Sequence, residues 1–375
     1  MVIGIPKESL ISETRIAILP VEIKKLSSDK LTFIIESGAG NGSYISDEDY
    51  SNAGADIVTD VYSDSDLIVR INPPSKEELS KIKDETSLVS LLGPFTNHNL
   101  IKQLAKKHIS SFCLELIPRS TYAQSMDVLS SQATVAGYRA VLNAATHMGK
   151  FFPMLMTPAG TIKPSTVLIL GAGVAGLQAI ATASRLGAKV EAFDVRSAAR
   201  EQVESLGAKF LYMDLDNAAE TNSGYAVEMN EEFIRKEMEL LHDAAKRVDA
   251  IITTALIFGK KAPILIKDYM VNDMQPGSCI IDLAAENGGN CDLTKPGELI
   301  HHNGVIIDGR LNLPAQIPYH ASQMLSKNIS KLLTEITEDG KVKFDMENEI
   351  IKGCLVTHEG NIIHEMTKNI IEGAK

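Results

Sequence analysis

The amino-acid sequence predicts an α/β protein of two domains, one of them built on a doubly wound parallel sheet. Residues 166–170 form a short apolar run of the length of a buried strand. A glycine-rich turn, a helical segment at 177–186 and a second strand at 189–193 follow it directly. Elsewhere apolar runs of strand length alternate with helical segments. This alternation is typical of a parallel sheet covered by helices.

The turn after the first of these strands has the spacing of a dinucleotide-binding fingerprint and reads Gly171, Ala172, Gly173, Val174, Ala175, Gly176. Gly171 permits the tight turn, Gly173 lets the backbone approach a pyrophosphate, and Gly176 lets helix and strand pack closely. The N-terminus of the following helix offers N–H groups and a partial positive charge to phosphates. Strand, turn, helix and second strand together predict a Rossmann domain that binds a dinucleotide.

An acidic residue ends the second strand of this unit. Asp194 lies 18 residues after Gly176, where a carboxylate accepts hydrogen bonds from the ribose hydroxyls of the adenosine half. Its charge would repel a 2′-phosphate, which favours NAD(H) over NADP(H). Arg196, two positions on, leaves NADP(H) open as an alternative, and Val195 between them is expected in the same site.

Two further buried strands are expected at residues 248–255 and 278–284. Both end in small or polar residues at the edge where open α/β sheets bind ligands. We therefore expect cofactor contacts from four residues at or just after the ends of these strands: Thr254, Ala255, Leu256 and Glu286.

The N-terminal segment of the chain repeats the strand and helix alternation. Strands are predicted at 2–5, 32–35, 67–71 and 87–92, with helices at 20–27, 46–53, 75–82 and 97–107. Ser75 and Glu78 have capping-box spacing at the third of these helices. Longer helices are predicted within 122–150 and 322–336, and a strand or hairpin within 350–363. We expect two domains around a cleft. A Rossmann-like α/β domain of residues 1–125 is completed by the C-terminal segment 330–375, and residues 126–329 form the Rossmann domain with linking helices at both ends.

The composition is that of a soluble globular protein, with 44% hydrophobic and 23% charged residues among 375. A net charge of −11 argues against nucleic acid or an anionic membrane surface as a partner. The four cysteines lie far apart and are expected to be reduced and buried. The histidines suggest no metal site, and we expect no signal peptide and no transmembrane helix.

Several segments resemble the family of alanine dehydrogenases and NAD-binding α subunits of proton-translocating transhydrogenases. The similar segments near the start are residues 4–8 (GIPKE), 13–17 (ETRIA) and 37–40 (SGAG). Two more are similar to the transhydrogenase subunits alone: residues 118–132, which contain AQSMDVLSSQ, and residues 282–291 (DLAAENGGNC). The resemblance spans essentially the whole chain.

The resemblance assigns roles to particular residues. It implies that four residues surround the nicotinamide: Arg119, Gln124, Asp127 and Ser130. Arg119 and Asp127 would hold the carboxamide of the ring. The alternative for this pair is a solvated salt bridge at the start of a helix. Gly224 and Tyr225 match a mobile loop whose tyrosine closes over NAD(H); an inert surface insert is the alternative. Phe258 departs from the proline that is usual in the family, which leaves the shape of that turn open.

Alanine dehydrogenases of this family move protons with a lysine and a histidine. Near the corresponding strands this chain has residues 70–74 (RINPP) and 91–94 (LLGP), which supply neither. Direct hydride transfer between two nicotinamides needs no protein acid or base. The resemblance thus implies the NAD(H)-binding subunit of a (Si-specific/Re-specific) proton-translocating transhydrogenase. Its partners would be a β subunit that binds NADP(H) and membrane-spanning subunits that translocate the protons. The chain would form a homodimer and lie in the cytoplasm, peripherally associated with the inner membrane. An alanine dehydrogenase or a non-catalytic NAD sensor is the alternative.

Overall fold

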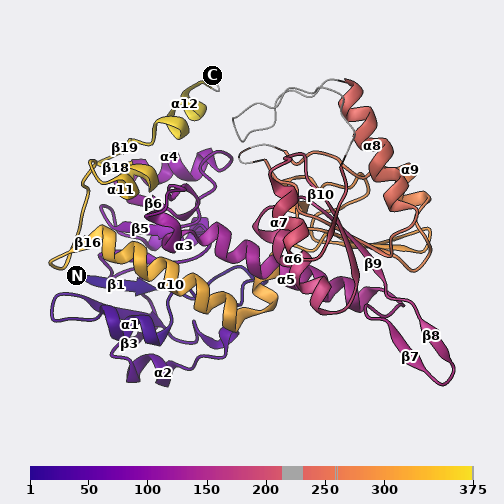
Figure 1. Ribbon diagram of the computed structural model, residues 1–375. Helices are drawn as coiled ribbons and strands as arrows, with labels where there is room; N and C mark the ends of the chain where they lie inside the picture. Colours follow the sequence, from indigo (N-terminus) through magenta and orange to yellow (C-terminus); the bar gives the residue numbers. More distant parts are fainter. Residues whose placement is uncertain (213–230, 258, 260, 374–375) are drawn as a thin grey trace. The chain divides into compact units, whose positions relative to one another are not determined.

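The computed structural model describes residues 1–212, 231–257, 259 and 261–373. The chain divides into two compact units, residues 1–132 with 314–375 and residues 133–313 (Figure 1). The sequence places these boundaries at 125/126 and 329/330. The first unit extends further at both because Met126, Val128 and Leu325 belong to its hydrophobic core.

The first unit contains a mixed sheet in the order β19-β18-β6-β5-β4-β1-β2-β3. Its parallel strands are β1 (Val2–Ile5), β2 (Thr32–Glu36), β3 (Asp56–Val58), β4 (Leu67–Val69), β5 (Ser87–Ser90) and β6 (Ser110–Cys113). The C-terminal segment returns to this sheet as an antiparallel hairpin of β18 (Leu355–His358) and β19 (Asn361–Ile362). The prediction that the tail completes the first domain is therefore confirmed.

Helices cover both faces of this sheet. One face packs against α1 (Pro20–Leu26), α2 (Asp47–Asn52), α10 (Pro318–Ile336) and α11 (Glu349–Cys354). The other packs against α3 (Lys76–Lys81), α4 (His98–Lys106) and α12 (Glu365–Gly373). The Ser75 side chain accepts from the Glu78 amide and Glu78 accepts from the Ser75 amide, as the predicted capping box requires. A small hairpin follows α10, formed by β16 (Thr337–Glu338) and β17 (Lys341–Val342).

The second unit has the sheet order β11-β10-β9-β12-β13-β15-β14. The parallel strands are β9 (Thr166–Leu170), β10 (Lys189–Phe193), β11 (Lys209–Phe210), β12 (Ala250–Thr253), β13 (Cys279–Asp282) and β15 (Val305–Asp308). Among the described strands of this sheet, only the edge strand β14 (Leu299–His302) is antiparallel. β9 is central, and the chain winds first to one side of it and then to the other. This order confirms the Rossmann prediction.

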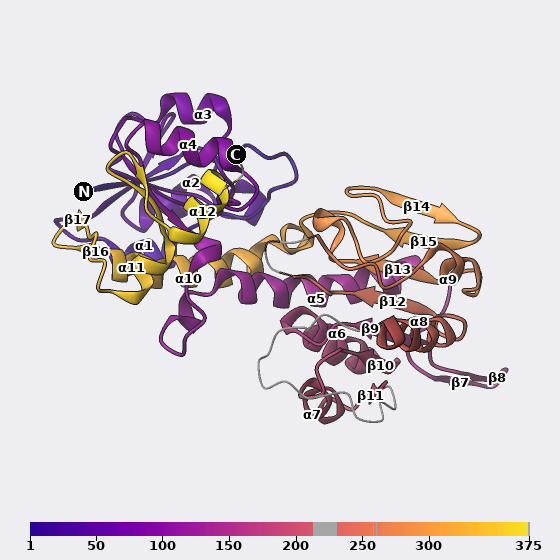
Figure 2. The same ribbon diagram turned by 90° about the horizontal axis from the view of Figure 1, so that it is seen from above.

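Helices cover both faces of the second sheet as well (Figure 2). α5 (Val128–His147), α6 (Val174–Arg185) and α7 (Ala199–Ser205) share a core with Val167 and Ile169. α8 (Glu231–Ala245) and α9 (Asp268–Asn272) share a core with Leu168 and Leu170. Successive residues of a strand point to opposite faces, so a strand buried on both faces is apolar throughout.

Several elements of the structure were not expected from the sequence. β3 and β6 were not expected, because β3 is a short edge strand and β6 begins with two serines. The segment between α5 and β9, for which no strand was predicted, contains a hairpin of β7 (Leu155–Thr157) and β8 (Gly160–Ile162). Short 3₁₀ helices occupy several connections: η1 (Asn41–Ser43), η2 (Leu114–Leu116), η3 (Ala123–Met126), η4 (Ala285–Asn287) and η5 (Leu313–Gln316).

All four cysteines are buried and free. Among the residues that the structure describes, no helix has the length and apolar character needed to cross a membrane.

Candidate nucleotide-binding site

The glycine turn lies between the central strand β9 and helix α6. Gly171 has φ +96°, and a Cβ atom there would lie 2.6 Å from Thr254 Oγ1. A Cβ on Gly176 would lie 1.9 Å from the carbonyl oxygen of Gly171, so only glycine allows this close packing. Gly173 is the N-cap of α6, no side chain caps the helix there, and a Cβ would meet nothing within 4 Å. The turn therefore presents open backbone at a helix N-terminus, with Val174 and Ala175 in the first turn.

Helix α5 packs against the first turn of α6, next to the glycine turn. A Cβ on Gly137 of α5 would lie 2.1 Å from the carbonyl oxygen of Ala175 in the first turn of α6. α5 can approach the turn this closely only because residue 137 has no side chain. Gly137 was not predictable from the sequence, since a single glycine within a helical pattern carries no signal about its partner.

Asp194 follows β10 at the same edge of the sheet and is held by backbone and side-chain donors. The Ala172 amide donates to Oδ2 at 2.7 Å and the Arg196 amide to Oδ1 at 2.8 Å. The Arg196 guanidinium donates to both oxygens, each at 2.9 Å. Burial alone would raise the pKa of Asp194, but these hydrogen bonds outweigh it and lower that pKa below its usual value. Asp194 is therefore ionised at neutral pH and tied directly to the glycine turn.

The segment after β12 packs onto the same turn. Thr254 Oγ1 lies 3.2 Å from the Leu170 carbonyl oxygen and 3.1 Å from that of Gly171, and it donates to them. Asn290 holds the next residues: its Oδ1 accepts from the Ala255 amide, and its Nδ2 donates to the carbonyl oxygens of Ala255 and Pro263. The buried Asn290 side chain thus clamps both ends of the 255–263 loop.

Asp282, at the end of β13, in turn orders the segment that carries Asn290. Its Oδ2 accepts from the amides of Asn290 and Cys291 and from Thr294 Oγ1, and its Oδ1 accepts from Thr253 Oγ1 and the Ala284 amide. These contacts link the ends of β12 and β13. Neither Asp282 nor Asn290 was predicted as a site residue from the sequence, although an acid at the end of a buried strand was an available signal.

The remaining predicted residues of the second unit lie at the carboxyl edge of its sheet. Val174, Val195 and Leu256 are apolar side chains that remain about half exposed there. Glu286 is exposed in η4, directly after β13. The structure therefore gathers the predicted cofactor residues of this unit that it describes at one edge. Gly224, Tyr225 and Phe258 lie outside the described residues.

The residues assigned to the nicotinamide lie in the first unit. Asp127 precedes α5, where its Oδ1 accepts from the Ser130 amide at 2.9 Å and its Oδ2 from Ser130 Oγ at 2.6 Å. Arg119 and Gln124 are exposed, and in the described part of the chain Arg119 forms no ion pair with Asp127. The Asp127 carboxylate thus acts as a helix cap in this structure.

In the first unit, the 70–74 segment belongs to a buried network of ion pairs and hydrogen bonds. Arg70 is fully buried, 3.1 Å from Glu78 and 3.5 Å from Glu8. Asn72 donates to Glu8 and Glu13 through its side-chain amide.

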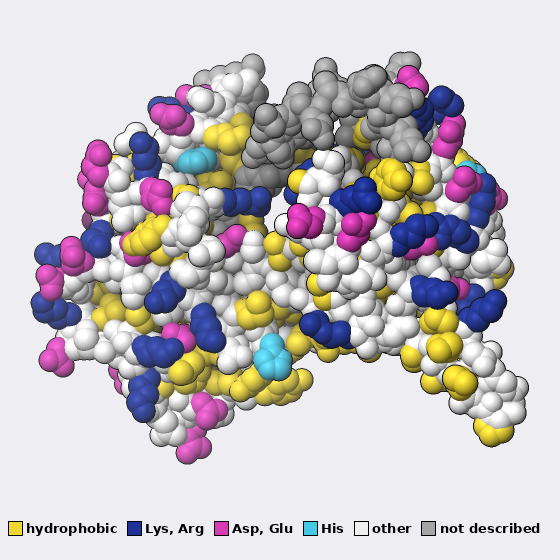
Figure 3. All heavy atoms as spheres, viewed as in Figure 1, with side chains coloured by type: hydrophobic (Ala, Val, Ile, Leu, Met, Phe, Trp, Pro, Cys, Tyr) yellow, Lys and Arg dark blue, Asp and Glu magenta, His cyan; other side chains and the backbone are white. Residues whose placement is uncertain are grey.

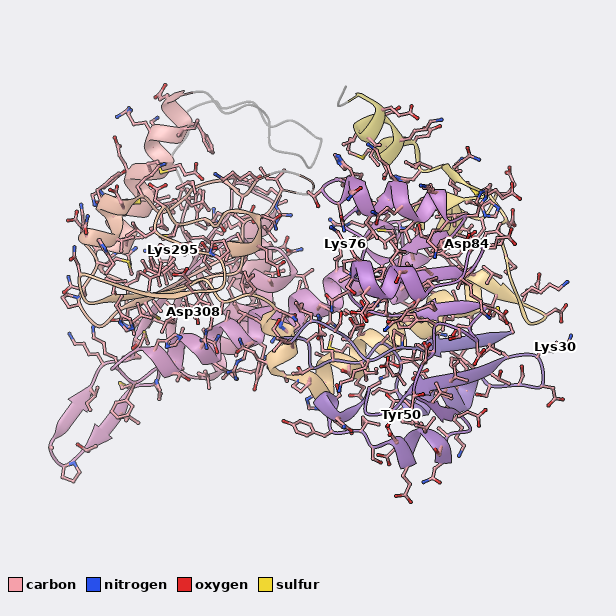
Figure 4. All side chains as sticks on the ribbon, turned by 180° about the vertical axis from the view of Figure 1, so that it is seen from behind. Lys30, Tyr50, Lys76, Asp84, Lys295 and Asp308 are labelled. Carbon is pink, nitrogen blue, oxygen red and sulfur yellow. The ribbon has the colours of Figure 1, made fainter. Side chains whose placement is uncertain are left out.

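In the second unit, Asp308 (labelled in Figure 4) accepts from Arg310 Nε at 2.9 Å and lies 3.0 Å from His147 Nε2. These contacts join α5 to β15. Within the described ranges no group of three potential metal ligands comes together.

Comparisons with known proteins agree with this geometry. Residues 4–136 match the family described as "Alanine dehydrogenase/PNT, N-terminal domain", and residues 140–365 match the corresponding C-terminal domain. The chain is 45% identical to an NAD(P) transhydrogenase subunit alpha chain of Rhodospirillum rubrum, covering 97% of this chain and 98% of that protein. A solved transhydrogenase structure from Sinorhizobium meliloti is similar, with a TM-score of 0.88 and 40% identity over 97% of this chain and all of that one. Alanine dehydrogenase of Mycobacterium tuberculosis is 27% identical, over 97% of this chain and 95% of that protein.

Proposed function

Because the chain belongs to the alanine dehydrogenase/PNT family, we propose that it is the NAD(H)-binding α subunit of a proton-translocating transhydrogenase. The observation that carries the proposal is the second unit, whose glycine turn, Asp194 and 255–263 loop meet at one edge of a Rossmann sheet. The higher identity to transhydrogenase subunits than to the alanine dehydrogenase supports this choice within the family.

The chain's own residues would divide the work of binding. The backbone at Gly173 and the first turn of α6 would hold the pyrophosphate, and Asp194 the adenosine ribose. Thr254, Ala255, Leu256, Val195 and Glu286 would line the rest of this half. Arg119, Gln124, Asp127 and Ser130 would orient the nicotinamide ring, which supplies the hydride. No residue of this chain needs to donate or remove a proton in that step.

The other half of the reaction would lie on partner subunits. We place NADP(H) on a β subunit and the proton path in membrane-spanning subunits. Hydride would pass directly between the two rings, with the (Si-specific/Re-specific) stereochemistry of the proton-translocating enzyme. Direct transfer requires the reacting carbons to approach to about 3–3.5 Å. The chain itself would lie in the cytoplasm, attached peripherally to the inner membrane through these partners and not inserted in it.

A homodimer forms part of the proposal. The β7–β8 hairpin extends away from the sheet of the second unit, and hydrophobic side chains gather on it (Figure 3). Met156 is 78% exposed, and Met154 and Ile162 are also exposed. Exposed apolar clusters of this kind are typical of contact surfaces between chains. Replacing Met156 with serine should shift the sedimentation equilibrium toward monomer, and an unchanged equilibrium would remove the hairpin from the interface.

NADH titration of Asp194→Ala tests the nucleotide site. The variant loses charged hydrogen bonds worth about 1.5–3 kcal/mol and should bind NADH roughly ten- to hundredfold more weakly. Titration curves equal to those of the wild type would exclude Asp194 from the site. Alanine-dependent reduction of NAD would instead favour the dehydrogenase alternative, and NADH binding without turnover beside any partner would favour the sensor.

A further inference from the structure

Arg196 covers the carboxylate that is proposed to hold the ribose. Its Nε and Nη2 each donate to a different oxygen of Asp194 at 2.9 Å. The Asp194 side chain is 7% exposed beneath it, whereas the Arg196 side chain is 51% exposed. In the described part of the chain, Asp194 is the hydrogen-bond partner of this guanidinium.

All the strong acceptor positions of Asp194 are occupied in this arrangement. A carboxylate offers about four acceptor sites. Two accept the amides of Ala172 and Arg196, and two accept the guanidinium. The two backbone donors belong to the fold, so they would keep the carboxylate aimed if the guanidinium left. Only the two positions taken by the Arg196 side chain can be given to a ligand.

The guanidinium resembles the ribose in the donors that it presents. Its fork places two N–H groups side by side on one carboxylate. The 2′- and 3′-hydroxyls of a ribose offer two neighbouring O–H donors to the same pair of oxygens. The guanidinium and the ribose cannot bind Asp194 at once. Two guanidinium N–H groups and two ribose hydroxyls, added to the two backbone amides, would exceed the roughly four acceptor sites of the carboxylate.

We propose that Arg196 is an internal competitor of the nucleotide ribose for Asp194. The inference rests on the proposed function, since it assumes that Asp194 takes the adenosine ribose. The nucleotide displaces the guanidinium into solvent, and the ion pair re-forms when the nucleotide leaves. Arg196 thereby lowers the affinity for ribose nucleotides, and its removal strengthens binding where removal of Asp194 weakens it.

Adenosine is the probe that isolates this competition. It carries the ribose diol but no phosphate and no charge, so loss of the Arg196 charge does not alter its long-range attraction to the site. Its affinity is measured by displacement of bound NADH from the full chain, with the NADH affinity of each variant determined first. 2′,3′-Dideoxyadenosine, which lacks both hydroxyls, serves as the matched ligand.

The test variants are Arg196→Gln and Arg196→Lys. Arg247→Gln is the matched control, because Arg247 also forms a two-point pair, with Glu191, at similar exposure (47% and 12%). Arg196→Gln should bind adenosine about two- to fivefold more tightly, as expected from loss of a half-exposed ion pair. Arg196→Lys should show a smaller gain, since one ammonium cannot present the paired fork. Arg247→Gln should leave adenosine binding unchanged, and dideoxyadenosine should gain nothing in any variant.

Two results would contradict the inference while leaving the proposed function standing. One is an Arg196→Gln affinity for adenosine that equals or falls below that of the wild type, while NADH still binds. The other is an equal gain for dideoxyadenosine. Failure of the wild-type chain to bind NADH would instead reject the proposed function.

Discussion

Gly137 should control nucleotide binding although it lies on a different helix from the glycine turn. In Gly137→Ala the added Cβ would lie 2.1 Å from the Ala175 carbonyl oxygen. Real Cβ contacts with backbone begin near 3.0 Å, so α5 and the first turn of α6 must separate by about 0.9 Å. The shift moves the amides at Gly173 and Val174 relative to Asp194.

The structure sets the size of the effect. Overpacking of a buried contact lowers the free energy of unfolding by about 1–3 kcal/mol, and replacing a glycine within a helix by alanine raises it by about 1 kcal/mol. The free energy of unfolding should therefore fall by no more than about 2 kcal/mol. Misaligning one amide that donates to a charged phosphate costs about 1.5–3 kcal/mol, so NADH binding should weaken roughly ten- to hundredfold.

NADH and adenosine titrations on the same protein separate the two consequences. Gly137→Ala should lose affinity for NADH far more than for adenosine, which makes no phosphate contact. Gly149→Ala is the control, since a Cβ at Gly149 meets nothing within 4 Å; its NADH affinity should match the wild type. Equal NADH affinity in Gly137→Ala, or equal losses for both ligands, would refute the supporting role of α5.

Three further variants test the other parts of the site. Asn290→Ala leaves three backbone groups of the 255–263 loop without a partner and should weaken NADH binding about tenfold; an unchanged titration would remove the clamp from the site. Asp308→Asn should lower the free energy of unfolding at pH 7 by about 1.5–3 kcal/mol. Burial raises the pKa of Asp308, but the hydrogen bonds from Arg310 and His147 lower it by more, so the folded pKa lies below the unfolded value. The ionic stabilisation is therefore fully present above the unfolded pKa of about 3.9 and is lost progressively as the pH falls through the lower folded pKa. Denaturation at pH 7 and pH 3.5 should show the variant's deficit shrinking in acid, and a constant deficit would contradict the ionic role. Arg119→Ala should reduce turnover in the assembled enzyme more than NADH affinity, and the reverse pattern would place Arg119 elsewhere.

The fold was predictable where local patterns coincide with tertiary position. β9, β12 and β13 are buried on both faces, so each appears in the sequence as a nearly continuous apolar run, and β10 was recognised from its place after the glycine turn and its helix. β6 was not predictable because its serines are buried by pairing with β18, which is 240 or more residues away: Ser111 Oγ lies 2.7 Å from Thr357 Oγ1, at a separation of 246 residues. No local pattern records such a partner.

The residues of the candidate site likewise fall into those that local spacing predicts and those that act through contacts distant in sequence. The glycine turn and Asp194 were predictable because their spacing along the chain fixes their geometry. Gly137, Asp282 and Asn290 act through contacts with residues distant in sequence, namely Ala175, Thr253 and Ala255. The occupation of Asp194 by Arg196 also required coordinates, since in the sequence Arg196 only left NADP(H) open as an alternative to NAD(H).

A hydride-transfer assay with and without an NADP-binding partner distinguishes a transhydrogenase subunit from a dehydrogenase or a sensor. Purified chain is mixed with NADPH and an NAD analogue whose reduction can be followed separately, first alone and then with the β subunit of a related transhydrogenase. We expect NADH binding but no transfer by the chain alone, and transfer once the partner is added. Alanine-dependent reduction of NAD by the chain alone, or no transfer with any such partner, would exclude the transhydrogenase function.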